Sequence, residues 1–458
     1  MPLRDTAPKL TPEEYEKNFA DITPPMNPRQ AAIEASRCLY CFDAPCTIAC
    51  PTHIDVPGFI KRIMTNNVRG AARVILEANI LGESCGRVCP TEVLCEGACV
   101  MVEKGEEAIE IGRLQRYAVD HVLDRNIRLF QAGAPNGRRV ACIGSGPASL
   151  ACAADLARRG YRVTVFDRGE LPGGLGTYGI AAYKTRVTDA LREVEMVKSL
   201  GVEFRQKTDI GRDISFDQLE KDFDAIFIGV GLGETWAMDI PGENLDGVYG
   251  ALEFIERTKV LQFGQVAVGR RVACIGAGNT AIDVVTAARR LGAETVYLVY
   301  RRSDQEMSAF RYEYELAKKD GVNFLWQTQP VRILGEKDAV AGLECVRTRL
   351  GDPDDRGKRF PETIPNSQFT IDVDMVVRAV GQKPVTEFLR GVRGIELRKN
   401  GTIVVNARNQ TGNPKYFAGG DCVNGGREVV DAVAEGMAGA RGVEAWLGGS
   451  ADARPAEN

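Results

Sequence analysis

The most informative part of the sequence for the architecture is Arg139-Val-Ala-Cys-Ile143-Gly144-Ser-Gly146-Pro-Ala-Ser149. Its apolar start predicts a buried strand, and the run Leu150–Arg159 predicts a helix after the glycine-rich turn. Such a turn brings backbone N–H groups and the N-terminus of the helix to a pyrophosphate. A second strand, Arg162–Phe166, ends in Asp167, where an acid suits a ribose hydroxyl. The stretch predicts a dinucleotide site, and a plain tight turn is the alternative.

The same order of strand, glycine-rich turn and helix recurs 132 residues later. A strand at Val272–Ile275 leads into Gly276-Ala-Gly278-Asn-Thr-Ala281 and a helix at Ile282–Leu291. The next strand, Val296–Tyr300, ends in Arg301-Arg302, and arginine there suits a 2′-phosphate, although a solvated basic pair is the alternative. One glycine motif is weak evidence, whereas two indicate a flavin and a nicotinamide cofactor in one chain.

Cysteines crowd the first third of the chain. Eight of the 13 fall in the pattern Cys38-x2-Cys41-x4-Cys46-x3-Cys50-Pro and Cys85-x3-Cys89-Pro-x4-Cys95-x3-Cys99. Runs of this kind hold [4Fe–4S] clusters, because one short loop wraps three corners of a cubane and the fourth ligand comes from elsewhere. Zinc prefers paired C-x2-C knuckles, and only Cys38/Cys41 has that spacing. Disulfides conflict with a reducing compartment.

Composition narrows the class of protein. The 458 residues predict about three domains, and the net charge of −4 argues against a nucleic-acid partner. No apolar run reaches the roughly 18 residues that span a bilayer, and the N-terminus lacks a secretory signal, so we expect a cytoplasmic protein without a membrane partner. Asn27-Pro-Arg-Gln30 predicts the start of a helix over Ala31–Arg37, and helical patterns recur at Gly58–Thr65 and Gly70–Ala78.

From Asp167 onward the chain resembles flavoproteins that have two dinucleotide-binding domains. The resemblance rests on Pro172-Gly-Gly-Leu175, on the strand–glycine segments Ala225–Gly231 and Val376–Gly381, and on Phe417-Ala-Gly-Gly-Asp421. It implies FAD contacts at Gly144, Ser145, Gly146, Pro147, Ala148, Asp167, Gly174, Leu175, Lys184, Gly231, Gly420 and Asp421. It implies NAD(P) contacts at Gly276, Gly278, Asn279, Thr280, Ala281, Arg301 and Arg302.

The cysteine-rich third resembles two relatives, the dihydropyrimidine dehydrogenase family (the N-terminal half of the long enzyme, or the bacterial PreT-type subunit) and the glutamate synthase small subunit. The stretch Ile111–Tyr117 discriminates between them, because the first family has a glutamine ligand where Gln115 stands and the second typically has a glutamate. The resemblance implies one cluster on Cys38, Cys41, Cys46 and Cys99, and a second on Cys50, Cys89, Cys95 and Gln115. Cys85 is then a spare thiol. Division of the eight cysteines into two sets of four, with Gln115 as a surface residue, is the alternative.

The expected fold class is α/β, with a helical iron–sulfur domain followed by two Rossmann-like domains, the NAD(P) domain being inserted in the FAD domain. The boundaries we expect are 1–135 for the [4Fe–4S] domain, 136–255 and 379–450 for the two parts of the FAD domain, 256–378 for the NAD(P) domain, and 451–458 for a polar tail.

The resemblance also implies the function. NAD(P)H gives a hydride to FAD, and electrons pass singly through two [4Fe–4S] clusters, with no catalytic side chain required. A PreA-type FMN/iron–sulfur subunit would then reduce uracil or thymine in a hetero-oligomer. Ser308 stands where the long enzyme has a basic residue for the 2′-phosphate, so NADH and NADPH both stay open. The alternatives are a glutamate synthase small subunit, a stand-alone NAD(P)H:ferredoxin-type oxidoreductase and a docking subunit without cofactors.

Overall fold

The computed structural model describes residues 3–355 and 359–448, so the predicted tail at 451–458 lies outside the described residues. The chain forms two units. The first contains the N-terminal residues through Ile22, Tyr178–Arg186 and Gly233–Lys383, and the second contains Thr23–Thr177, Val187–Leu232 and the residues from Pro384 onward.

The cysteine-rich segment is helical, as predicted. Asn27 caps α2 (Pro28–Ser36) in a capping box with Gln30. Helices α4 (Val56–Met64) and α5 (Val68–Ala78) each begin two residues before the predicted start, because Asp55 and Asn67 accept hydrogen bonds from backbone N–H groups and cap them. The remaining elements of this segment are α3 (Pro45–Ala49), α6 (Gly82–Val88), the 3₁₀ turn η1 (Thr91–Val93), α7 (Val100–Glu103) and α8 (Ile111–Leu123).

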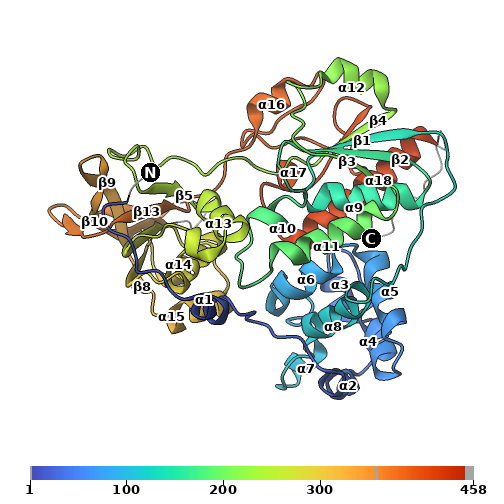
Figure 1. Cartoon of the computed structure of the whole chain (residues 1–458), viewed down its shortest axis with the longest axis horizontal. Coiled ribbons are helices and arrows are strands. Elements are labelled where there is room, and N and C mark those ends of the chain that lie inside the picture. The colour runs from blue at the N-terminus through green and yellow to red at the C-terminus, as the bar shows by residue number, and fades with distance from the viewer. Residues whose placement is uncertain (1–2, 356–358, 449–458) are drawn as a thin grey trace. The chain divides into compact units, whose positions relative to one another are not determined.

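The second unit also contains a parallel sheet in the order β14-β4-β1-β2-β3. Alternate residues of its strands face two apolar cores. Helices α9, α11 and α18 cover one face, and α12 and α16 cover the other (Figure 1). The bounds are β1 (Arg139–Ile143), β2 (Arg162–Phe166), β3 (Glu203–Arg205), β4 (Ala225–Ile228), β14 (Tyr416–Ala418), α9 (Pro147–Arg158), α10 (Leu175–Tyr178), α11 (Val187–Lys198), α12 (Phe216–Asp222), α16 (Thr386–Arg390), α17 (Asp421–Asn424) and α18 (Val429–Leu447).

The first unit is built on a second parallel sheet, in the order β5-β13-β6-β7-β8. Helices α13, α14 and α15 cover one face. Its elements are α1 (Pro12–Asn18), β5 (Val248–Gly250), α13 (Ala251–Val260), η2 (Phe263–Gln265), β6 (Arg271–Ile275), α14 (Asn279–Arg290), β7 (Thr295–Val299), η3 (Asp304–Glu306), α15 (Arg311–Lys319), β8 (Asn323–Leu325) and β13 (Met375–Arg378).

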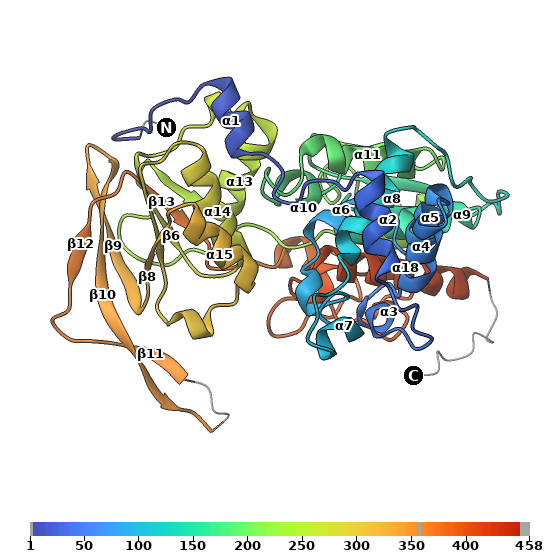
Figure 2. The same cartoon turned by 90° about the horizontal axis from the view of Figure 1, so that it is seen from below.

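The other face of this sheet packs on antiparallel strands that the sequence patterns do not predict. They are β9 (Thr328–Glu336), β10 (Ala339–Pro353), β11 (Arg359–Thr363) and β12 (Phe369–Ile371). Ile333, Val340, Leu343 and Cys345 bury their side chains against the parallel sheet. The far end of β10 pairs with β11 alone and forms an extended hairpin (Figure 2).

The order of the strands confirms the predicted fold class. Strands of the first sheet come from residues 139–228 and 416–418, and all strands of the second sheet lie between them in sequence, from 248 to 378. Within the described residues, no helix is both long enough and apolar enough to span a bilayer.

Candidate cofactor sites

The four cysteines predicted for the first cluster line one cavity, which we call the first cysteine cavity. Cys38 and Cys41 precede α3, Cys46 lies in α3, and Cys99 is the N-cap of α7. The rest of the wall is apolar and consists of Leu39, Pro45, Val56, Pro57, Ile60, Val100, Met101, Ile109 and Ile111. Four sulfur donors around an apolar cavity are the donor set of a [4Fe–4S] cluster.

The second cysteine cavity is lined by Cys50, Cys85, Cys89, Cys95 and Gln115. It thus holds the four predicted ligands of the second cluster and also Cys85, the predicted spare thiol. The buried Gln115 donates a hydrogen bond from Nε2 to the Gly82 carbonyl at 2.8 Å. That bond uses the amide nitrogen, so the amide oxygen is the end of the group suited to a metal. The wall is completed by Pro51, Ile54, Asn79, Thr91, Leu94, Gly112 and Val430.

An uncompensated negative charge is unfavourable in both cysteine cavities, because each contains buried thiols. Burial raises the pKa of Cys46 to about 11 and raises the pKa of Cys38. A hydrogen bond with Cys85, together with burial, raises the pKa of Cys89. Thiolates are the form that binds metal, and a bound cation deprotonates its thiol ligands. In the described part of the chain no group of three His, Cys, Asp or Glu side chains is placed closely enough to hold a single metal ion.

The predicted FAD turn is shaped by close backbone contacts. Gly144 has φ +90°, and a Cβ there would lie 2.5 Å from the Gly229 carbonyl oxygen. Gly146 is the N-cap of α9 and offers no side chain, so the first N–H groups of the helix receive no side-chain cap from it. Asp167 accepts hydrogen bonds from the Ser145 N–H at 2.7 Å, the Ser145 hydroxyl at 2.6 Å and the Gly169 N–H at 2.6 Å. These bonds tie the acid to the glycine turn.

The later FAD residues approach the same turn. A Cβ on Gly174, the residue before Leu175, would lie 2.7 Å from the Gly146 Cα. A Cβ on Gly420 would lie 3.0 Å from the Ala148 Cβ, next to Pro147. Gly231 has φ +64° with open space around it. Asp421 begins α17, and burial raises its pKa. The structure thus brings most of the predicted FAD residues together around the first turn of α9.

Lys184 is also predicted to contact FAD. It belongs to the first unit, whereas the others belong to the second. Its buried ammonium lies 2.7 Å from Asp283 Oδ1 and 2.5 Å from Glu313 Oε1. Despite the burial, which opposes the charged form, the two carboxylates raise the pKa of Lys184. The side chain therefore serves an ion-pair network of the first unit.

The predicted NAD(P) turn opens into a cavity of about 590 Å³. Gly276, Gly278, Thr280 and Arg301 line it. Gly276 has φ +132°, and a Cβ there would lie 2.3 Å from the Ala379 carbonyl oxygen, so the turn requires glycine. A cavity of this size beside the N-terminus of α14 fits a dinucleotide.

The remaining NAD(P) residues support this turn or lie at its rim. Asn279 accepts a hydrogen bond from the Phe310 N–H at 2.9 Å, and Ala281 is buried in α14. Arg301 is exposed at the end of β7, and Arg302 follows it outside the cavity lining. Ser308 also lines the cavity, 3.4 Å from where a Gly278 Cβ would lie.

Two parts of these sites have no signal in the sequence pattern around the predicted residues. Trp236, the Thr328–Pro330 stretch and Gln382 line the NAD(P) cavity although they lie far from the glycine turn in sequence. Gly381 ends the segment that is predicted to be a strand–glycine crossover. It is the one residue of that cavity wall that the sequence pattern indicates. Glu193 is a second residue that the sequence does not indicate. Its carboxylate accepts hydrogen bonds from the Glu83 and Ser84 N–H groups of α6, and nothing in the pattern of α11 distinguishes it from a surface glutamate.

Two family profiles match the chain, one over each part. The family described as dihydropyrimidine dehydrogenase domain II, 4Fe-4S cluster, matches residues 15–127. The family described as pyridine nucleotide-disulphide oxidoreductase matches residues 138–436. The matches cover the cysteine-rich helices and the two parallel sheets.

Curated relatives are similar along nearly the whole chain. The glutamate synthase [NADPH] small chain of Escherichia coli (strain K12) is 38% identical over 444 residues, which are 94% of each chain. The NADP(+)-dependent formate dehydrogenase subunit beta of Moorella thermoacetica is 36% identical over 431 residues, 88% of this chain and 60% of that one. Among solved structures, Mycobacterium tuberculosis FprA in complex with NADPH superposes with a TM-score of 0.56 at 20% identity, over 69% of this chain and 87% of that one. That likeness shows the fold.

Proposed function

Since this chain belongs to the family of NAD(P)H-dependent FAD and 4Fe-4S oxidoreductase subunits that includes the glutamate synthase small chain, we propose that it is the electron-input subunit of a two-subunit dihydropyrimidine dehydrogenase. FAD, when bound, takes a hydride from NAD(P)H and releases single electrons to iron–sulfur clusters. The partner is a PreA-type FMN/iron–sulfur subunit that reduces uracil or thymine.

The observation that carries this choice of partner is the position of Gln115. Its side chain lines the second cysteine cavity, and its amide nitrogen is held by the Gly82 carbonyl. In the resembling dehydrogenase family a glutamine takes this place as a cluster ligand, and in the glutamate synthase subunit a glutamate does. The match of the cysteine-rich helices to dihydropyrimidine dehydrogenase domain II points the same way.

The linings of the two cavities favour an order for the electron path. Val430 of α18, a helix that packs on the first parallel sheet, lines the second cysteine cavity. All described lining residues of the first cysteine cavity come from residues 38–111. The cluster on the flavin side would therefore be the second, and the first cluster would deliver electrons to the partner.

The surface around the first cysteine cavity supports transfer to another subunit. Phe42 is 100% exposed, Ile48 67% and Leu39 50%, and all three lie between Cys38 and Cys50. Asp43 is the only charged residue of that stretch. Exposed large apolar side chains in a stretch of low charge are typical of a protein–protein contact, and this contact would bury them against the partner.

A reconstitution experiment tests the proposal. Anaerobically purified chain should reduce artificial dyes with NADH or NADPH, and should form dihydrouracil from uracil only after a PreA-type subunit is added. Dihydrouracil formation by the chain alone would contradict the division of labour. Dye reduction without any coupling to the PreA-type subunit would contradict the choice of partner.

A glutamate synthase small subunit is the second candidate. The near-complete mutual coverage with the Escherichia coli small chain favours it. The same preparation mixed with a glutamate synthase large subunit decides between the two, because NAD(P)H-driven glutamate formation would replace dihydrouracil formation.

A further inference from the structure

Glu193 of α11 is buried, with 1% of its surface exposed, and its partners lie on another helix. Its Oε1 accepts hydrogen bonds from the Glu83 N–H at 2.9 Å and the Ser84 N–H at 3.0 Å. Its Oε2 accepts a short hydrogen bond from the Ser84 hydroxyl. These N–H groups belong to the first turn of α6, whose own N-cap, Leu81, supplies no side-chain hydrogen bond. Glu193 therefore does from α11 what an N-cap side chain normally does.

The helix that Glu193 holds forms one wall of the second cysteine cavity. Cys85 lies in α6, and Cys89 is its C-cap. The Gly82 carbonyl, at the start of α6, anchors the amide of Gln115. Three residues that line the cavity thus take their positions from α6.

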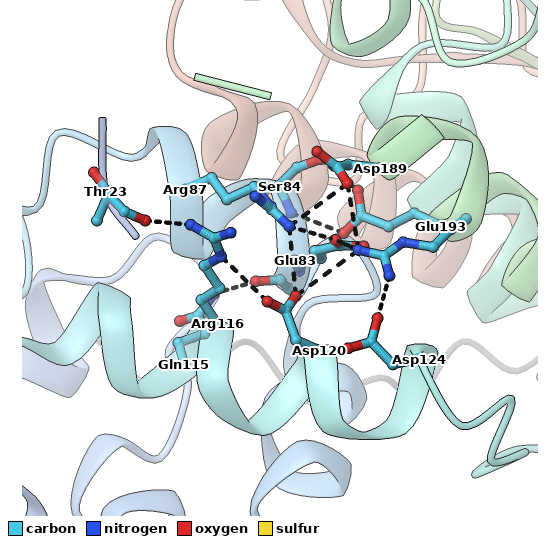
Figure 3. A network of polar contacts seen from close by, with 12 residues as sticks. Thr23, Glu83, Ser84, Arg87, Gln115, Arg116, Asp120, Asp124, Asp189 and Glu193 are labelled. Atoms are coloured by element: carbon cyan, nitrogen blue, oxygen red, sulfur yellow. Dashed lines mark hydrogen bonds and ion pairs between the residues drawn. The ribbon is translucent and has the colours of Figure 1, made fainter. Parts of the chain in front are cut away.

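Charged side chains from three helices surround this contact (Figure 3). Glu83 pairs with Arg87 at 3.0 Å and also with Arg192. Asp120 lies 3.2 Å from Arg116 and 3.7 Å from Arg87. The groups that face Glu193 and Glu83 are completed by Asp189, which contacts Arg87 and Arg192, and by Asp124, which contacts Arg192.

We propose that Glu193 is the positioning residue for the second cluster, because it ties the cavity wall made by α6 to a helix of the first parallel sheet. The proposal rests on the proposed second cluster. Loss of the carboxylate would leave the N–H groups of Glu83 and Ser84 buried without their acceptor. The wall that carries Cys89 and anchors Gln115 would then shift, and the surroundings of the cluster would change.

The carboxylate also places a titrating charge near the cluster. Burial, reinforced by repulsion from Glu83, raises the pKa of Glu193 to about 8, and burial raises the pKa of Glu83 to about 7. An ionised Glu193 favours the more positive, oxidised form of a nearby cluster, so it lowers the reduction potential. This effect should be present above the pKa and absent below it.

The test compares Glu193→Gln with Glu195→Gln, an exposed glutamate on the same helix whose partner is Lys198. Each cluster is titrated potentiometrically by EPR in the whole protein at pH 6 and pH 9. At pH 9, Glu193→Gln should favour the reduced second cluster about tenfold, which is ~59 mV for one electron. At pH 6 the shift should nearly vanish. The first cluster, and both clusters of Glu195→Gln, should match the wild type.

Different results would contradict the positioning role of Glu193 and the proposed second cluster. About eight irons per chain with an unchanged EPR line shape of the second cluster in Glu193→Ala, which removes the acceptor of the Glu83 and Ser84 N–H groups, would overturn the positioning role. Unchanged potentials in Glu193→Gln, which keeps Oε1 as an acceptor, would overturn the effect of the charge. About four irons in the wild type would overturn the proposed second cluster itself, and the inference with it. If Glu193→Gln does not fold, Ser84→Ala removes only the hydroxyl contact and should still change the EPR line shape of the second cluster. An unchanged line shape in that variant would equally count against the inference.

Discussion

The two cysteine cavities have similar sequence patterns but different surroundings. The first has four cysteines, an otherwise apolar wall and exposed apolar side chains at its rim. The second also has four cysteines, one of them Cys85, and in addition Gln115. Its wall is anchored by a buried carboxylate and flanked by ion pairs (Figure 3). The comparison teaches that equal cysteine counts can serve different tasks. The first cavity lies beside exposed apolar side chains, and the second is joined through Glu193 to a helix that packs on the first parallel sheet.

The largest expected effect comes from removing one thiol of the first cysteine cavity. Cys46→Ser should lower the iron content from about eight to about four per chain, because a [4Fe–4S] cluster with three thiolates is easily lost. Reduction of dyes by NAD(P)H should persist through the flavin, whereas transfer to the partner should stop. Iron analysis and both activity assays measure this. Cys345→Ala, a buried cysteine of β10, is the control and should keep all irons.

In the second cysteine cavity the ligands themselves can be tested against one another, since five candidate side chains are present for the four irons of one cluster. Cys89→Ser should remove the second cluster, and Cys85→Ser should retain about eight irons. Gln115→Ala should alter one EPR signal and spare the other, and Gln115→Glu, which keeps an oxygen donor, should restore most of the signal. Iron loss in Cys85→Ser together with a normal Gln115→Ala spectrum would show that the cluster is held by thiolates alone.

The apolar rim of the first cysteine cavity should matter for the partner but not for the cofactors. Phe42→Ser should weaken binding of the PreA-type subunit about tenfold, since burying an exposed aromatic ring is worth ~1–2 kcal/mol. Titration calorimetry in low and high salt measures it, and the affinity should depend little on salt. Phe360→Ser changes a phenylalanine of β11 that is 50% exposed, and it should leave the affinity as it is. Equal losses in both variants would argue against a specific contact.

The smallest effect concerns stability and pH. The folded-state pKa of Glu193, about 8, lies above the ordinary value of 4.5. The contribution of this group to stability is therefore fully present below pH 4.5 and is lost as the pH rises through 8. We expect the Tm of the wild type to fall by a few degrees across that window, and the fall to be shallower in Glu193→Gln. Differential scanning calorimetry measures both slopes, and parallel slopes would contradict the assignment.

Much of the fold follows from local pattern. The strands β1 and β2 begin and end at the predicted residues, and the capped helix at Asn27 forms as expected, because short apolar runs and caps act over a few residues. The sequence pattern does not predict the antiparallel strands β9 to β12, because β10 mixes buried and exposed positions irregularly along its 15 residues. Its register depends on the sheet it covers, which no local signal reports.

In the candidate sites, too, local spacing predicts some residues, whereas long-range contacts determine others. Spacing alone selected cysteines that the structure gathers into two cavities, because ligands carried on short loops are close in both sequence and space. The contact of Glu193 with α6 joins residues 109 and 110 positions apart. Lys184 stays a predicted contact to FAD, and the structure adds ion pairs of its ammonium with Asp283 and Glu313 that the sequence does not indicate. Pairings of this kind depend on how helices meet, and a buried charge is visible only once its partners are known.

The placement of β14 and α18 at the end of the first sheet has a consequence for biosynthesis. β14 pairs with β4, and α18 packs on α9 and supplies Val430 to the second cysteine cavity. Both emerge from the ribosome after the whole inserted sheet has been translated. Until then the β4 edge and the apolar side of α9 stay uncovered, so cluster loading of the second cavity should follow the translation of α18. Slow translation near residue 416 should favour aggregation of the nascent chain.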